Sequence, residues 1–118
     1  MKFNSRALLT FLFGILVMMG TSLVSVSAQD EGSIAVLLPD SVSSDRWEND
    51  DRRFLEGAFE EAGVEYSIVN AEGDARTQLT QAEAAITSGA RVLLMVNLDS
   101  SSGATIIELA RENDVAVI

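Results

Sequence analysis

The sequence predicts an α/β protein with a parallel sheet and helices on both faces, in the order β-α-β-α-β-α-β. Short, continuous apolar runs indicate strands that are buried on both sides. The segments between them repeat apolar residues every three or four positions, which is typical of helices that pack on one side. The loops between these segments have only a few residues, and this alternation favours parallel strands joined by helices.

The first half of the pattern gives two strands and a helix. The apolar run IAVLLP, residues 34–39, predicts the first strand, and VEYSIVN, residues 64–70, predicts the second by its alternation. Between them an apolar stripe predicts a helix that ends at Gly63, a residue suited to a left-handed cap. The stripe consists of Trp47, Phe54, Leu55, Ala58, Phe59 and Ala62.

The second half repeats the pattern. Asp74 is suited to cap a helix that Gly89 ends, and RVLLMVN, residues 91–97, predicts the third strand. The segment SSSG leads into a last helix with Arg111 in its final turn, and VAVI, residues 115–118, predicts the fourth strand. The predicted inward faces are Leu79, Ala82, Ala85 and Ile86 in the first of these helices, and Ala104, Ile107 and Ala110 in the second.

Residues 1–28 have the composition of a secretory signal peptide. Lys2 and Arg6 precede an apolar stretch over residues 7–19, and the small residues of VSA end at Ala28. A retained membrane anchor is the alternative, but the apolar stretch is shorter than the roughly 20 residues of a membrane span. We therefore expect cleavage after Ala28 and a periplasmic or extracellular protein that is not embedded in the membrane.

The last strand ends at Ile118 with no polar segment or helix after it to cover its edge. An apolar parallel strand left bare invites aggregation. We therefore expect residues 29–118 to be the N-terminal piece of a longer protein; the alternative is a complete four-stranded domain.

The composition excludes several functions. The chain of 118 residues has a formal net charge of −10, which argues against nucleic acid as a partner. It contains no cysteine and no histidine, which removes disulfides, the usual zinc ligands, the Ser-His-Asp triad and a thiol nucleophile. We expect no enzymatic activity, no metal and no cofactor.

The segment SSDRWENDDRRF, residues 43–54, follows the first predicted strand and holds the one tryptophan of the sequence. In an open parallel sheet, ligands bind beyond the carboxyl ends of the strands, so Arg46 and Trp47 are candidate binding residues. Spacing alone also allows Trp47 to be a core residue of the helix stripe. It likewise allows Arg46 to be a surface partner of Asp45 or Asp50.

Three segments carry a resemblance to a known family: IAVLLPDSVSSDRWENDD, NAEGDARTQLTQAEAAITSGARVLLMVNLDSSS and ARENDVAVI. They resemble the sugar-binding proteins of bacterial ABC importers, which have the type I periplasmic binding fold, with the xylose-binding branch nearest. The acidic residue followed by Arg-Trp is the most specific feature, whereas the second segment is shared by many members. The resemblance implies two lobes joined by a hinge, one monosaccharide held between them, and a membrane permease as partner.

The resemblance implies that Arg46 donates hydrogen bonds to sugar hydroxyls and that Trp47 stacks on the ring. An indole face suits the C–H patch of a sugar, and a guanidinium carries five donors in a fixed fork. Asp40, at the mouth of the first strand, could accept from a hydroxyl or cap the turn after Pro39. Asp99 matches the acid of the family's Pro-x-Asp turn, where it caps a helix, but Asn97 stands where the family has proline. A further contact motif of the family, Tyr-Asp-Arg, would follow residue 118.

The predicted function is the solute-binding component of a carbohydrate ABC transporter, with a pentose such as D-xylose as ligand. The alternative is a sugar-sensing periplasmic domain that acts on a membrane receptor or kinase. An exported carbohydrate hydrolase is disfavoured, because no pair of carboxylates stands at defined strand ends.

Overall fold

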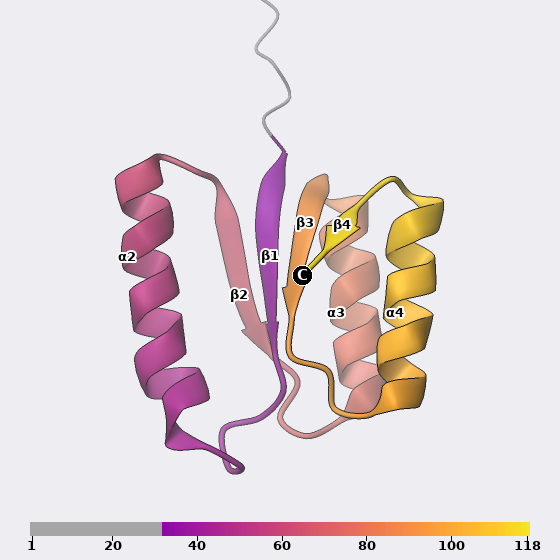
Figure 1. Ribbon diagram of the computed structural model, residues 1–118, viewed down its shortest axis with the longest axis horizontal. Coiled ribbons are helices and arrows are strands. Elements are labelled where there is room, and N and C mark those ends of the chain that lie inside the picture. Colours follow the sequence, from indigo (N-terminus) through magenta and orange to yellow (C-terminus); the bar gives the residue numbers. More distant parts are fainter. Residues whose placement is uncertain (1–31) are drawn as a thin grey trace, which may run out of the picture.

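The computed structural model describes residues 32–118, and the predicted signal peptide lies outside this part of the chain. These residues form one four-stranded sheet in the order β2-β1-β3-β4 with all strands parallel (Figure 1). The strands are β1 (Ser33–Leu38), β2 (Tyr66–Asn70), β3 (Ala90–Met95) and β4 (Ala116–Val117). The helices are η1 (Trp47–Asp51), α2 (Arg52–Ala62), α3 (Ala75–Thr87) and α4 (Ser100–Glu112).

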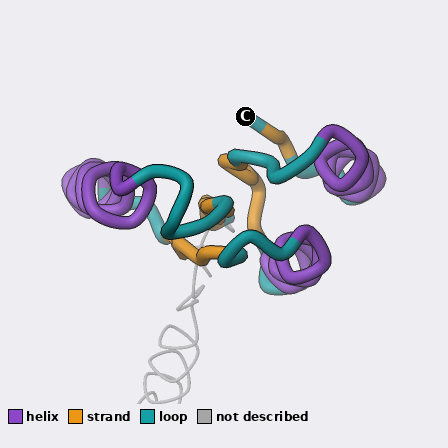
Figure 2. The backbone as a smooth tube through the Cα atoms, turned by 90° about the horizontal axis from the view of Figure 1, so that it is seen from below, coloured by secondary structure: helices purple, strands orange, loops and turns teal. Residues whose placement is uncertain are grey.

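Helices cover both faces of the sheet. Seen along the strands, α2 lies on one face, and α3 and α4 lie together on the other (Figure 2). The predicted α/β class, element order and parallel pairing are therefore confirmed. The strand ends differ from the predicted ones by one or two residues, and β4 extends through backbone hydrogen bonds that join Ile118 to Leu93 and Met95.

The central strand, β1, pairs with both β2 and β3, so that Val36 lies opposite Ile68 on one side and Leu94 on the other. Because all strands run the same way, the loops that follow β1, β2 and β3 meet at one edge of the sheet, at the bottom of Figure 1. Backbone hydrogen bonds join two of these loops, from Gly73 N to Pro39 O at 2.9 Å. This carboxyl edge is where the candidate binding residues were expected.

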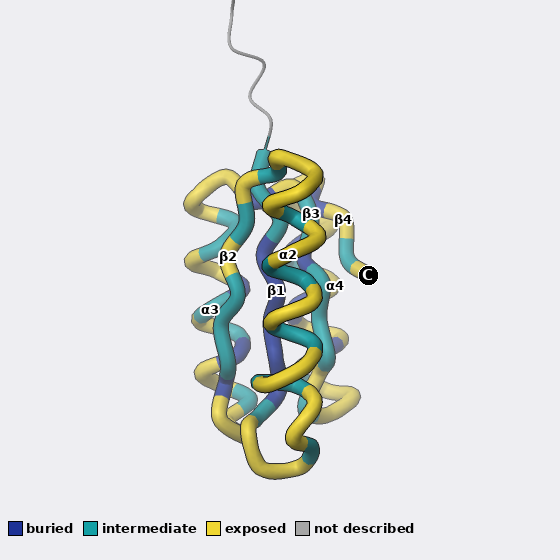
Figure 3. The backbone as a smooth tube through the Cα atoms, turned by 90° about the vertical axis from the view of Figure 1, so that its left-hand side faces the viewer, coloured by how far each residue is buried: buried dark blue, intermediate teal, exposed yellow. Residues whose placement is uncertain are grey.

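The main core lies between the sheet and the α3–α4 layer. Leu37, Leu93 and Ile106 are fully buried there, and burial of side chains of this size stabilises the fold by about 1.5–3 kcal/mol each. The predicted inward face of α3 is confirmed, since Ala82 is fully buried and the other three residues pack against the same cluster. Figure 3 shows β1 buried behind α2, whose own backbone is largely exposed.

The predicted apolar face of α2 is only partly correct. In the described chain, neither η1 nor α2 has a fully buried residue, and Phe54 is 65% exposed. Leu55 and Phe59 are half-buried, and the ring of Phe59 lies 5.2 Å from that of Tyr66 on β2. The reason is that, among residues 32–118, α2 has no helix beside it on its face of the sheet, so only the side turned toward the sheet finds a partner.

The predicted inward face of α4 is confirmed at Ala110 but is displaced by one position at Ala104 and Ile107. Gly103, Ile106 and Ala110 are buried, whereas Ala104 and Ile107 are exposed. A Cβ atom on Gly103 would lie 3.0 Å from the Cβ of Asn97, so this helix turn lies directly against the loop that follows β3. That close approach fixes the rotation of α4 about its axis and turns Ile106 inward.

The predicted helix caps are confirmed. The side chain of Asp74 accepts from the backbone N–H groups of Arg76 and Thr77, and that of Asp99 accepts from those of Ser101 and Ser102. These bonds satisfy N–H groups that the first helical turn leaves free. At the other end of α2, Gly63 has the left-handed conformation (φ 66°) that its sequence position predicted.

One polar residue of the core was not predicted. Gln78 on α3 is fully buried, and its side chain bonds to the loop after β3. Its Nε2 donates to Val96 O at 2.9 Å, and its Oε1 accepts from Leu98 N at 3.4 Å. The side chain therefore supplies partners to backbone groups of the half-buried loop residues Val96 and Leu98.

We expect Gln78→Leu, made in the complete protein, to reduce the free energy of unfolding by about 1–3 kcal/mol. The loss of the amide leaves Val96 O and Leu98 N without partners in the core. Denaturant unfolding followed by circular dichroism measures the change. Thr80→Leu, on an exposed position of the same helix, is the control and should have little effect. Equal stability of the Gln78 variant and wild type would contradict this role.

The two helix caps predict a pH dependence. Hydrogen bonds from the helix N–H groups lower the pKa of Asp74 and of Asp99 below the unfolded value of 3.8. The stability that these carboxylates contribute is therefore present above pH 3.8 and is lost as the pH falls through their lowered folded-state pKa values. In a double variant with Asp74→Asn and Asp99→Asn, the unfolding midpoint should be lower than in wild type at neutral pH. The difference in unfolding midpoint between the variant and wild type should disappear in acid. A difference that stays constant with pH would contradict the capping role of the two carboxylates.

Candidate functional site

The candidate site lies at the carboxyl edge of the sheet, in the segment that joins β1 to α2. This segment ends in η1, a single turn of π-helix in which Arg52 N donates to Trp47 O. A π turn inserted at the start of an α-helix is uncommon and occurs often at functional positions. Trp47 is its first residue, and Arg46 precedes it.

Trp47 is half-buried and is not part of the core. Its indole Nε1 donates to Ser43 Oγ at 3.3 Å, which ties the ring to the loop after β1. The described structure therefore does not favour the alternative in which Trp47 is a core residue. A half-buried indole at a sheet edge still has surface that can contact a ligand.

Arg46 lies directly beside this indole. Its Cζ is 4.6 Å from the centroid of the Trp47 ring, close enough for a cation–π interaction. Its guanidinium pairs with Asp51, with 3.0 Å between Nη2 and Oδ2 and 3.1 Å between Nε and Oδ2. The partner is thus Asp51 and not Asp45 or Asp50, the residues suggested by the sequence. The Arg46 side chain is 61% exposed, so it remains accessible.

A second set of polar residues joins η1 to the end of β2. Glu48 pairs with Arg52 and accepts from Asn70 Nδ2 at 2.8 Å, while Arg52 Nη1 donates to Ile68 O at 3.0 Å. The hydrogen bonds from Arg52 and Asn70 lower the pKa of Glu48. This set was not predicted from the sequence, where the spacing of four residues between Glu48 and Arg52 is its one signal.

Asp40 closes the turn that follows β1. Its Oδ1 accepts from Val42 N at 2.8 Å and also from Ser43 N, and these bonds lower its pKa. This is the capping role that the sequence allowed for it, and contact of Asp40 with a ligand stays a prediction. Nearby, Ser41 Oγ donates to Glu72, which connects the loops after β1 and β2.

The loop that follows β3 departs from the family pattern at Asn97, yet it keeps an ordered turn. Asn97 Nδ2 donates to Asp99 O at 2.9 Å. This hydrogen bond restrains the backbone at the position where the family's proline would restrict it through its ring. Asp99 caps α4, as the resemblance implied. Asp40, Arg46 and Trp47 thus all lie in the segment between β1 and α2, whereas Asp99 caps α4.

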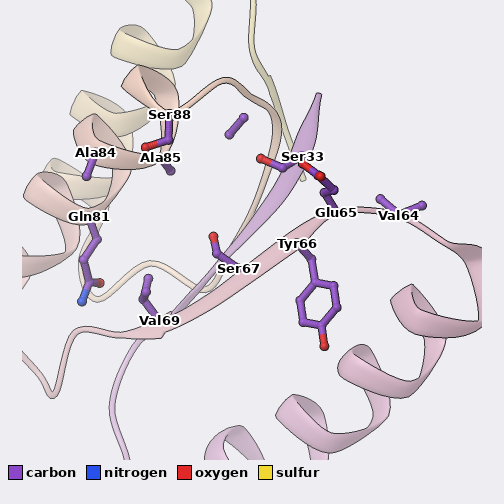
Figure 4. A pocket seen from close by; sticks show the side chains of 11 residues that line it. Ser33, Val64, Glu65, Tyr66, Ser67, Val69, Gln81, Ala84, Ala85 and Ser88 are labelled. Carbon is purple, nitrogen blue, oxygen red and sulfur yellow. The ribbon is translucent and has the colours of Figure 1, made fainter. Parts of the chain in front are cut away.

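A separate cavity of about 570 Å³ lies away from this edge, between the outer strand β2 and α3 (Figure 4). Its walls are mainly small and apolar, with Val64, Val69, Ala84 and Ala85 among them. Neither Arg46 nor Trp47 lines it. Charged groups that would fix a ligand's orientation are scarce, since Glu65 is the one charged residue among those that line it.

Metal binding and membrane insertion find no support within residues 32–118. No group of three or more acidic, histidine or cysteine side chains in this part of the chain is arranged to hold a metal ion. None of the helices described has the length and apolar character needed to cross a bilayer.

Two proteins whose solved structures resemble this fold hold a bound sugar. A solute-binding protein of an ABC transporter from Clostridium phytofermentans, with bound β-D-glucose, is 27% identical over 71% of this chain and 25% of its own, with a TM-score of 0.65. A carbohydrate transporter solute-binding protein from Chloroflexus aurantiacus, in complex with D-glucose, is 30% identical to this chain. The match covers 70% of this chain and 24% of that protein, with a TM-score of 0.61.

A third structure supports the fold alone. The periplasmic binding protein component of the arabinose ABC transporter from Shewanella sp. ANA-3, bound to L-arabinofuranose, is 12% identical. It covers 72% of this chain and 28% of its own, with a TM-score of 0.64. This chain thus spans about a quarter of the length of each of these proteins.

A search of curated proteins gave no significant match. The sequence model of the family described as "Periplasmic binding protein domain" matches residues 34–118, which is most of the chain and nearly all of the part that the structure describes. With the parallel sheet order and the sugar-binding structural neighbours, this match shows that the chain belongs to the periplasmic binding protein domain family.

Proposed function

We propose that this chain supplies one wall of a monosaccharide site in the solute-binding component of an ABC transporter, with Arg46 and Trp47 as its contact residues. The observation that carries the proposal is the half-buried indole with a guanidinium beside it in the segment that follows β1. The indole offers an apolar surface for ring C–H groups, and the guanidinium offers donors for hydroxyls. Such a site binds its ligand without chemical reaction.

The charge of the edge favours an uncharged ligand. Residues 45–53 carry four carboxylates and three guanidinium groups, and the guanidinium of Arg46 beside the indole is already paired with Asp51. An anionic sugar would meet repulsion there. A neutral sugar can both donate to carboxylates and accept from Arg46. The two structural neighbours that hold D-glucose bind a ligand of this uncharged kind.

The finer proposals concern the sugar and the complete protein. The Asp45-Arg46-Trp47 sequence, which resembles the xylose-binding branch, supports a pentose such as D-xylose as ligand. Delivery to a membrane permease requires the second lobe and hinge that the family implies. Binding would then close the two lobes, and the permease would recognise the closed form.

Trp47→Ala in the complete protein should weaken sugar binding by about 30-fold, because the loss of an aromatic anchor often costs about 2 kcal/mol. Arg46→Lys keeps the charge but loses the guanidinium fork, so it should also weaken binding. Calorimetric titrations with D-xylose, D-ribose, D-glucose and D-galactose measure both effects and identify the preferred sugar.

The same helix offers a matched control. Arg53 lies over the ring of Phe54 at 4.8 Å, an arginine–aromatic pair like that of Arg46 and Trp47 but on exposed surface further along the helix. Phe54→Ala and Arg53→Lys should leave affinity unchanged. If Trp47→Ala instead lowered stability by about 3–5 kcal/mol and left every sugar affinity intact, Trp47 would be a core residue and the proposal would fail.

Export makes a further prediction. If residues 1–28 are a cleaved signal peptide, the mature protein begins at Gln29. Mass spectrometry of the protein recovered from the periplasm or the medium gives the N-terminus. An intact Met1 on membrane-bound protein would support the alternative of a membrane-anchored sensor.

A further inference from the structure

We propose that Asp51 is a positioning residue for the sugar-contacting arginine, and that the π turn of η1 is the device that brings it there. Asp51 is not itself proposed to touch the sugar. The inference rests on the proposed function, because it assumes that Arg46 contacts the ligand. It adds a residue that neither the sequence pattern nor the family resemblance pointed to.

The width of the helical turn decides whether Arg46 and Asp51 can meet. Arg46 and Asp51 are five positions apart, and in an α-helix of about 3.6 residues per turn such residues point in well-separated directions. A π turn holds about one more residue, so the fifth residue along comes round to the same side. The backbone bond from Arg52 N to Trp47 O, also across five positions, shows this wider turn. The ion pair between Arg46 and Asp51 is therefore a consequence of η1.

The contacts of Asp51 restrain the guanidinium without using up its donors. Asp51 binds the edge formed by Nε and Nη2, and its side chain is 25% exposed against 61% for Arg46. A guanidinium has five N–H groups, so this edge-on pairing leaves others for a ligand. The carboxylate and the Trp47 ring together hold a long side chain in one conformation. Ordering it in advance lowers the entropy cost of binding.

The turn that carries Asp51 is anchored to strand β2 of the sheet by side-chain hydrogen bonds. Glu48 pairs with Arg52 and accepts from Asn70, and Arg52 also donates to Ile68 O on β2. The π turn is therefore attached to the end of β2 by side chains on both sides of Asp51. By contrast, Asp50 pairs only loosely with Arg53, at 3.6 Å, and both side chains are more than half exposed.

This difference between adjacent acids supplies the test. In the complete protein, Asp51→Asn should weaken binding of D-xylose or D-glucose by about fivefold, since a surface ion pair contributes up to about 1 kcal/mol. Asp50→Asn removes the same charge from the same turn and should leave affinity unchanged. Asp51→Glu should restore part of the affinity. Thermal unfolding should show little change for all three variants.

A double-mutant cycle separates positioning from a merely structural effect. If Asp51 acts through the guanidinium, Asp51→Asn should have no further effect in an Arg46→Ala background. An equal loss in both backgrounds, or no loss in wild type, would overturn the positioning role while the proposed function stands. If Arg46→Ala itself leaves affinity unchanged, or neither sugar binds wild-type protein, the proposed function fails and this inference fails with it.

Discussion

The parallel pairing of β1 with both β2 and β3 is the constraint on which the rest of the structure depends. Because the three strands run the same way, their following loops are gathered at one edge. β1 is central, with Val36 and Leu37 fully buried on its two faces, and its register is set by pairing with a strand on each side. The position of Arg46 and Trp47 follows from where this strand ends.

Side-chain amides hold the gathered loops in place. Asn70, the last residue of β2, donates to Glu48 in η1 and accepts from the backbone N–H of Glu72 in the next loop. Gln78 likewise donates to and accepts from backbone groups of the loop after β3. Amides carry both donors and acceptors, so one side chain can satisfy groups from two segments. The edge is therefore ordered by hydrogen bonds from neutral amides together with the ion pair between Glu48 and Arg52.

The arginine–tryptophan pair combines two properties that a sugar site needs. The indole gives apolar surface, and the guanidinium beside it gives donors whose direction Asp51 restrains. The many acids of the chain do not form one metal-binding cluster within the described residues. Several instead cap turns and helices, as Asp40 and Asp99 do. An acidic composition here reflects local structure and solvation more than ligand charge.

The sequence by itself determined the fold class, the order of the elements and the caps, because these depend on apolar periodicity and on local hydrogen bonding, as at Asp74 and Gly63. It also placed Arg46 and Trp47 at a strand end. Only the tertiary structure decided which face of α4 is buried, since Gly103 against Asn97 sets its rotation. The tertiary structure alone also showed that Gln78 is buried and that η1 is a π turn. The π turn, and the pairing of Asp51 that it permits, depend on contacts with β2 that sequence spacing does not encode.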